Sequence, residues 1–232
     1  MVGEQYKQVL STVKKSIEDS NRREEEVTLI AVSKTKPVEM LQEVYNAGAR
    51  DFGENKVQEI LAKYDKLPSD IRWHMIGHLQ TNKVKYIADK VYMIHSVESI
   101  KLAEVISKEA VKVGRVIPIL IEVNIAEEES KFGIAQVECE EFIRQIHHLP
   151  GICIKGLMTI APFVENGEEN REYFKSLKQL SVDIMQKNID NVSMEFLSMG
   201  MSGDYETAIE EGANLVRVGT KIFGEREYFI TT

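Results

Sequence analysis

Short apolar runs alternate with longer amphipathic stretches along most of the chain. Glycine, proline or polar residues bound each apolar run, a pattern typical of strands that are buried on both faces. Eight runs fit this description, at residues 27–32, 51–53, 73–77, 91–95, 117–123, 152–157, 194–197 and 214–218. The runs at 51–53 and 194–197 give the weakest signal.

The stretches between these runs carry apolar residues at helical spacing, which predicts amphipathic helices. They cover residues 38–47, 57–64, 100–112, 135–147, 169–186 and 205–211. Gly48, Gly114 and Gly212 directly follow predicted helices, where a left-handed cap residue is favoured. Residues 4–17 show the same spacing and predict an additional N-terminal helix.

Strands that alternate with helices predict an α/β protein with a parallel sheet. Eight such units favour a single (β/α)8 TIM-type barrel over residues 1–232, with the extra N-terminal helix outside the repeat. An open, doubly wound sheet is the alternative. No low-complexity segment marks a second domain.

Composition narrows the class of protein. The formal net charge of −8 argues against a nucleic-acid or anionic-membrane partner, because either would need a basic face. No apolar run approaches the roughly 20 residues of a membrane span, and the amino terminus has helical spacing instead of a secretory signal. Two distant cysteines, Cys139 and Cys153, suit a reducing compartment. We therefore expect a cytoplasmic protein.

The first apolar run, which starts at Thr28, is followed closely by Lys34 and then by Pro37. A lysine at the end of a buried strand loses water on one side, which favours the neutral amine. A neutral amine that is fixed by a strand is what a Schiff base with an aldehyde cofactor requires. The alternative is a lysine whose side chain simply reaches solvent from the strand end.

In a barrel, functional side chains gather at the carboxyl ends of the strands. The residues that end or follow the predicted strands are Lys34, Asn55, His78, His95, Met158, Ser198, Gly200, Met201, Ser202, Arg217, Gly219 and Thr220. The last two loops are rich in small residues, and exposed backbone N–H groups in such loops bind phosphate. Each loop alone is better explained as a turn with a helix cap, but together they favour a phosphate site.

Charged and imidazole side chains at this edge leave two questions open. Arg217 interrupts an apolar run, so its charge needs a carboxylate such as Glu195 or Glu122, or a bound ligand. His74 and His78 stand four residues apart, which suggests zinc. They straddle a strand end, however, and no HExxH glutamate lies between them, so we do not predict a metal site.

Several ordered motifs now point to one family. They are Ala31-Val-Ser-Lys-Thr-Lys-Pro37, Phe52-Gly-Glu-Asn55, Trp73-His-Met-Ile-Gly-His-Leu-Gln-Thr-Asn-Lys83, Gly156-Leu-Met158, Leu197-Ser-Met-Gly-Met-Ser202 and Val216-Arg-Val-Gly-Thr220. Nearly the whole chain resembles the YggS/PROSC group of pyridoxal-phosphate-binding proteins, also called pyridoxal phosphate homeostasis proteins.

The resemblance implies a barrel like the N-terminal domain of alanine racemase, with Lys34 carrying pyridoxal 5′-phosphate (PLP) as a Schiff base. It implies that the loops at 198–202 and 219–220 hold the phosphate and that Arg217 approaches the pyridine nitrogen. Asn55 and His78 would line the ring pocket together with Met158, and Lys36 would be an auxiliary basic group.

The function implied by the resemblance is to hold, buffer or deliver the cofactor, and so to influence B6 vitamer and amino-acid balance. The expected partners are PLP, other vitamers and PLP-dependent apoenzymes. A cationic Arg217 would disfavour protonation of the pyridine nitrogen, which weakens the ring as an electron sink. This favours a carrier over an enzyme.

Two alternatives from other classes stay open. The first is a one-domain PLP-dependent amino-acid racemase or lyase. Residues 221–232 are too few for the separate domain that supplies a tyrosine base in the racemases, and we expect Tyr228 to pack against the barrel. The second is a cofactor-free barrel enzyme acting on a sugar phosphate, which would be colourless when purified.

Overall fold

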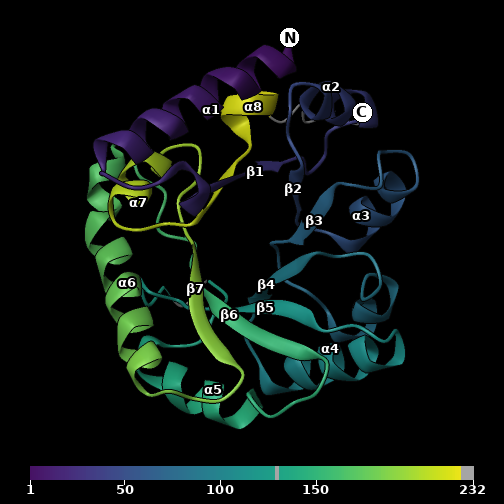
Figure 1. Cartoon of the computed structure of the whole chain (residues 1–232), viewed down its shortest axis with the longest axis vertical. Coiled ribbons are helices and arrows are strands. Elements are labelled where there is room, and N and C mark those ends of the chain that lie inside the picture. The colour runs from purple at the N-terminus through teal and green to yellow at the C-terminus, as the bar shows by residue number, and fades with distance from the viewer. Residues whose placement is uncertain (129–130, 226–232) are drawn as a thin grey trace, which may run out of the picture.

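The computed structural model describes residues 1–128 and 131–225. Its strands are β1 (Thr28–Val32), β2 (Asp51–Glu54), β3 (Arg72–Met75), β4 (Met93–Val97), β5 (Ile117–Glu122), β6 (Ile152–Met158), β7 (Val192–Ser198) and β8 (Leu215–Val218). Neighbouring strands pair in parallel and in chain order, and β8 pairs with β1, so the sheet closes into a barrel (Figure 1). The predicted barrel is confirmed. The open-sheet alternative is wrong, because an open sheet would leave its outer strands unpaired on one side.

Helices surround the barrel (Figure 1). They are α1 (Val2–Asp19), α2 (Val38–Asn46), α3 (Val57–Tyr64), α4 (Ile100–Lys112), α5 (Cys139–Ile146), α6 (Arg171–Gln186), α7 (Tyr205–Glu210) and α8 (Thr220–Phe223). Short 3-10 turns are η1 (Glu24–Glu26), η2 (Thr81–Tyr86), η3 (Gln136–Glu138) and η4 (Gly167–Asn170). The six helices predicted between strands are all present, and their ends differ from the prediction by a few residues.

Three elements lie wholly outside the predicted ones: η1 before β1, η2 between β3 and β4, and α8 after β8. In η2 only Val84 is buried, so the segment carries no apolar stripe from which a helix could be recognised. The four residues of α8 make little more than one turn, which is too short for a periodic pattern.

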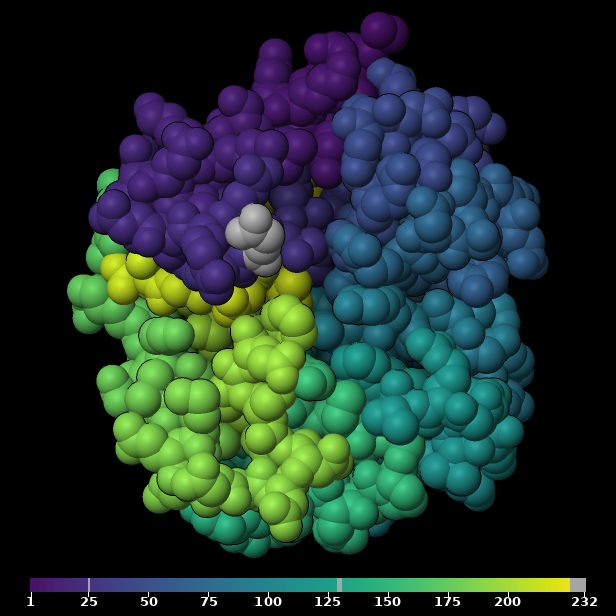
Figure 2. Space-filling view, in the orientation of Figure 1, coloured from purple at the N-terminus to yellow at the C-terminus, as the bar shows by residue number. Residues whose placement is uncertain are grey.

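The predicted N-terminal helix is confirmed as α1, which buries Tyr6, Val9, Val13 and Ile17 on one face. This face packs against α2, α7 and α8, and thus joins the start of the chain to its last elements. In the space-filling view, the purple N-terminal segment lies directly against the yellow C-terminal elements (Figure 2). The helix therefore covers the barrel where β8 meets β1.

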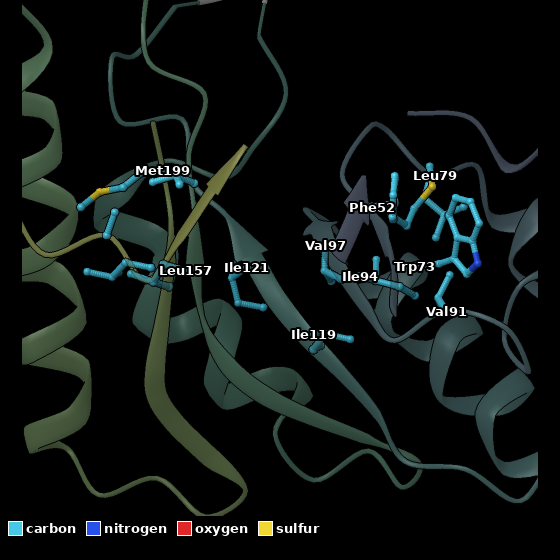
Figure 3. Packing of buried hydrophobic residues seen from close by; sticks show 14 of the residues in the cluster. Phe52, Trp73, Leu79, Val91, Ile94, Val97, Ile119, Ile121, Leu157 and Met199 are labelled. Atoms are coloured by element: carbon cyan, nitrogen blue, oxygen red, sulfur yellow. The ribbon is translucent and has the colours of Figure 1, made fainter. Parts of the chain in front are cut away.

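The apolar core has two layers. The larger layer lies between the strands and the helices and includes Phe52 and Trp73, whose ring centroids are 6.0 Å apart (Figure 3). A smaller cluster in the barrel interior consists of Ile30, Met93, Leu120, Met158 and Leu215. Because apolar side chains fill this part of the interior, polar interior side chains such as His74, His95 and Arg217 lie beside the apolar cluster.

A glycine shapes β6 where it meets β7. Gly156 has φ +154°, and a Cβ there would lie 1.8 Å from the carbonyl oxygen of Phe196. The pairing of β6 with both neighbours shifts register just before this residue. Only glycine allows this close approach, which sets the direction in which β6 delivers the loop after Met158.

Across residues 1–128 and 131–225, no helix has both the length and the apolar content needed to cross a bilayer.

Candidate functional site

A cavity of about 390 Å³ opens at the carboxyl ends of β1 and β8. Loops that follow β2, β6 and β7 complete its wall. Its lining residues are Val32, Lys34, Lys36, Asn55, Ile76, Ile160, Pro162, Phe163, Val164, Met201, Ser202, Gly203, Asp204, Arg217, Gly219, Thr220, Phe223 and Gly224. The volume lies within the range of small-molecule sites. The lining contains three basic side chains and one acidic side chain, which suits an anionic ligand.

Seven of the eleven residues expected to bind a cofactor line this cavity. They are Lys34, Asn55, Met201, Ser202, Arg217, Gly219 and Thr220. Chain segments almost two hundred residues apart meet here because β1 and β8 are neighbours in the closed barrel. The carboxyl-end rule for barrels thus brings most of the predicted site together.

Three predicted residues lie beneath the cavity instead of lining it. Met158 belongs to the apolar interior cluster, and Ser198 is fully buried with its hydroxyl bonded to Arg217 and His95. Gly200 has φ +88°, and its carbonyl accepts the Arg217 backbone N–H at 3.0 Å. These residues support the floor of the cavity.

His78 faces a neighbouring hollow, which shares Asn55 with the cavity and is also lined by Lys56 and Lys83. Its Nδ1 lies 2.7 Å from Glu98 Oε1, and its ring stacks on Phe132 with centroids 4.3 Å apart. His74, by contrast, points into the barrel and bonds Asp51. The two histidines considered for zinc therefore diverge.

The loop that carries Lys34 is fixed by a buried ionic cluster behind it. The Lys63 amine donates to Ser33 O at 2.9 Å, to Glu54 Oε1 at 2.7 Å and to Glu59 Oε2 at 2.8 Å. Glu54 also accepts the Ser33 hydroxyl at 2.7 Å. Burial raises the pKa of Glu54 to about 7, despite the opposing charge and hydrogen bond of Lys63. The cluster therefore fixes both the carbonyl and the hydroxyl of Ser33, the residue just before Lys34.

The next residue, Thr35, adopts φ +65°, a conformation that β-branched residues rarely take. Its backbone N–H donates to Glu59 Oε2 at 2.6 Å, which compensates for this strain. Beyond it, the Lys36 amine donates to the Glu225 carbonyl at 2.8 Å. Lys36 is therefore engaged with the segment after α8, although it also lines the cavity.

Arg217 enters the cavity from the barrel interior and is 4% exposed. Its guanidinium donates to Ser198 Oγ at 2.5 Å and to the Thr159 carbonyl at 2.7 Å. Burial lowers the pKa of Arg217 to about 10, so it remains a cation at neutral pH. Glu195 is not its partner, because Glu195 accepts from Lys155 on the surface.

Glu122, the other suggested partner of Arg217, is buried nearby at the end of β5. Burial and, to a lesser extent, the Glu98 charge raise its pKa to about 7, although the Arg217 charge opposes both effects. Its Oε2 has no hydrogen-bond partner among the described residues. Glu122 thus faces the Arg217 charge without forming a close ion pair.

The glycine-rich loop after β7 is held by Asp204. One carboxylate oxygen accepts the Met201 N–H at 2.6 Å and the other accepts the Asn170 amide at 2.7 Å. The Ser202 hydroxyl accepts the Gly219 N–H at 3.3 Å, which links this loop to the one after β8. The two small-residue loops therefore form one continuous wall.

Part of the cavity wall was missed at the level of sequence. Ile160, Pro162, Phe163 and Val164 follow β6 and close one side of the cavity, and Phe163 is 97% exposed. An apolar run around a proline within a long loop was the available signal, because a solvated loop has no need of such residues. Tyr228, expected to pack against the barrel, lies outside the described residues.

Comparison with known proteins identifies the family. The model of the alanine racemase N-terminal domain matches residues 10–227. A pyridoxal phosphate homeostasis protein of Aquifex aeolicus is 46% identical over 226 residues, which cover 97% of this chain and 98% of that protein.

Two solved structures share both sequence and fold with the chain. A crystal structure of an unknown protein from Bifidobacterium adolescentis has a TM-score of 0.90 and 35% identity, and the match covers 96% of this chain and 94% of that one. The structure of PipY of Synechococcus elongatus with PLP bound has a TM-score of 0.83 and 33% identity, and covers 97% of this chain and 100% of that one. The chain therefore belongs to the pyridoxal phosphate homeostasis proteins, within the alanine racemase N-terminal domain family.

Proposed function

We propose that this protein binds PLP through a Schiff base on Lys34 and serves to hold and supply the cofactor. The observation that carries the proposal is the cavity whose lining brings Lys34 together with Arg217 and the two small-residue loops. PLP occupies the related PipY structure, which supports the same ligand here.

The residues of the cavity fit the chemistry of PLP. An aldehyde needs an amine, which Lys34 provides, and a phosphate needs hydroxyl and N–H donors, which Ser202, Gly219 and Thr220 provide. The Asn55 side-chain oxygen is buried with no partner among the described residues, so it can accept a hydrogen bond from the ligand. The excess of basic groups balances the charge of the phosphate ester.

Each group has a distinct task in the proposed site. When bound, the cofactor supplies a reactive carbonyl and a conjugated ring. Lys34 anchors it, while Arg217 offers a cationic donor at the pyridine nitrogen and discourages protonation of that atom. Lys36, already bonded to Glu225, stabilises the anionic end of the site. The half-buried Pro162 and Val164 close one side of the site.

At the level of the cell, we propose a role in PLP homeostasis, as in the relatives that carry this name. Other B6 vitamers would compete for the same cavity, and PLP-dependent apoenzymes would receive the cofactor. We place this activity in the cytoplasm, where the two distant cysteines stay reduced.

The test is to trap the cofactor on the protein. After incubation with PLP, borohydride reduction and peptide mapping should locate the reduced adduct on Lys34, because Lys34 follows the apolar strand directly. Lys34→Ala should lose the visible absorbance of the imine. Lys36→Ala is the matched control, two residues away in the same loop, and should keep the adduct on Lys34.

Other outcomes point elsewhere. An adduct found only on Lys36 would reverse the assignment of the two lysines. Purified protein that stays colourless with added PLP, yet binds a sugar phosphate, would support the cofactor-free enzyme in place of a carrier.

A further inference from the structure

A chain of buried polar side chains crosses the interior of the barrel and ends at Arg217. His74 Nε2 lies 3.0 Å from Asp51 Oδ1, and His74 Nδ1 lies 2.9 Å from His95 Nε2. His95 Nδ1 then lies 2.8 Å from Ser198 Oγ, which also accepts from Arg217. We call these five residues, from five different strands, the interior relay. Each is less than a tenth exposed.

The far end of the relay fixes the direction of its hydrogen bonds. Burial opposes ionisation of Asp51, but hydrogen bonds from Arg72 and His74 lower the pKa of its carboxyl, so it is a carboxylate that accepts. Arg72 binds both carboxylate oxygens and balances their charge. A cationic His74 would therefore add an uncompensated buried charge. A neutral His74 donates from Nε2 and accepts at Nδ1.

The tautomer of His74 fixes the positions of the protons on His95 and Ser198. Because His74 Nδ1 accepts, His95 must donate from Nε2, and a neutral His95 then accepts at Nδ1. The Ser198 hydroxyl therefore donates to His95 while its oxygen accepts from Arg217. Burial and the Arg217 charge lower the pKa of His95 well below its usual range, which agrees with a neutral ring.

We propose that His95 is a positioning residue for Arg217: by orienting the Ser198 hydroxyl, it directs an oxygen lone pair at the guanidinium and fixes that cation in the cavity. A neutral His95 also keeps a second positive charge away from the ring nitrogen of the ligand. The inference rests on the proposed function for its ligand. The relay itself is a property of the protein without ligand.

Two substitutions of His95 separate the two bonds of its ring. In His95→Asn the amide oxygen replaces Nδ1, so the bond from Ser198 is kept and the bond to His74 is lost. In His95→Gln the amide replaces Nε2, so the bond to His74 is kept and the bond from Ser198 is lost. Ser198→Ala breaks the link between His95 and Arg217 and leaves both histidines in place. The exposed His148→Gln is the control.

The affinity for PLP should follow the bond from Ser198. We expect His95→Gln and Ser198→Ala to weaken PLP binding about tenfold, and His95→Asn to stay within about threefold of the parent protein. The absorbance maximum of bound PLP should shift only in the two variants that release Arg217. Thermal midpoints of the ligand-free proteins should fall by similar amounts in the Asn and Gln variants.

A nitrogen-15 NMR spectrum of the ligand-free protein at neutral pH shows directly which ring nitrogen of His95 carries a proton. It should show His95 protonated at Nε2 and bare at Nδ1. A proton on Nδ1 would overturn the inference, as would equal losses of PLP affinity in the Asn and Gln variants or unchanged affinity in Ser198→Ala. Failure of the parent protein to bind PLP would instead refute the proposed function, and the spectrum would still decide the direction of the relay.

Discussion

At the scale of single residues, the buried ionisable side chains near the cavity differ in how well their polar atoms are hydrogen-bonded. Arg217 and Lys63 each have several close polar partners, whereas Glu122 has an oxygen with no partner among the described residues. A buried carboxyl without compensation binds a proton more tightly. Glu122 should therefore make the stability of the fold depend on pH.

We predict that Glu122→Gln stabilises the protein above neutral pH. The pKa of Glu122 is raised from 4.5 to about 7 in the folded state, so the folded protein binds more protons than the unfolded chain between these values. Stability of the parent protein therefore falls as pH rises through this window. A neutral glutamine removes this loss, which amounts to about 1–3 kcal/mol at pH 8.

Denaturant unfolding at pH 5 and pH 8 checks this. The variant and the parent should differ little at pH 5 and clearly at pH 8. The surface substitution Glu18→Gln serves as control and should show no such divergence. A variant that is less stable than the parent at pH 8 would mean that Glu122 is held as a carboxylate by Arg217.

The residue scale also shows what sequence could predict. Lys34, Ser202, Arg217 and Thr220 line the cavity, and their place at this end of the barrel could be expected because each ends or follows a predicted strand. Ser198 was expected at the phosphate, but it points into the barrel. Side chains alternate between the two faces of a strand, and the sequence alone did not fix which face of β7 pointed inward.

At the scale of elements, all eight predicted strands occur, including the two with the weakest signals. These two strands could be predicted from the regular alternation of strands and helices, because an eight-stranded barrel closes only if every strand is present. The long loop after β6 was not recognised as cavity wall, since its role depends on packing against distant segments. Helical periodicity likewise gave no sign of η2 or α8.

The segments that follow β2 and β3 approach each other closely at Asn55 and Gly77. A Cβ at Gly77 would lie 2.7 Å from the Asn55 carbonyl oxygen and 2.8 Å from its Cα. Gly77→Ala should therefore displace Asn55 from the cavity wall, destabilise the fold by about 1–3 kcal/mol and weaken PLP binding.

Gly114→Ala is the control for this experiment. Gly114 has φ +67° and open space around it, so alanine there also strains the backbone but touches nothing near the cavity. Calorimetric titration should show weaker PLP binding in Gly77→Ala and parent-like binding in Gly114→Ala. Equal affinity in both variants would show that the position of Asn55 does not matter to the ligand.

At the scale of the whole molecule, an acidic protein concentrates basic groups at one cavity. The formal net charge is −8, yet the cavity lining has Lys34, Lys36 and Arg217 against Asp204 alone. A local positive potential in an otherwise negative surface attracts an anionic phosphate ester to one place. The closed barrel produces this by bringing the first and last strands together.

The last prediction concerns turnover: amino-acid racemisation by the PLP-loaded protein should be negligible. Racemisation needs an acid–base group on each face of the bound substrate. Among the described residues that line the cavity, the amines are Lys34 and Lys36 from one loop, and neither tyrosine nor histidine is present. Arg217, fixed by Ser198 and Thr159, also discourages the ring from accepting electrons.

Exchange of the α-proton of L- and D-alanine in heavy water, followed by NMR, measures this directly. The loaded protein should exchange far more slowly than the ordinary enzymatic range of about 1–1000 per second. An authentic alanine racemase under the same conditions gives the positive control, and Lys34→Ala gives the background. Exchange of both enantiomers at an enzymatic rate would require a second base above the cavity, and would make the protein a racemase instead of a carrier.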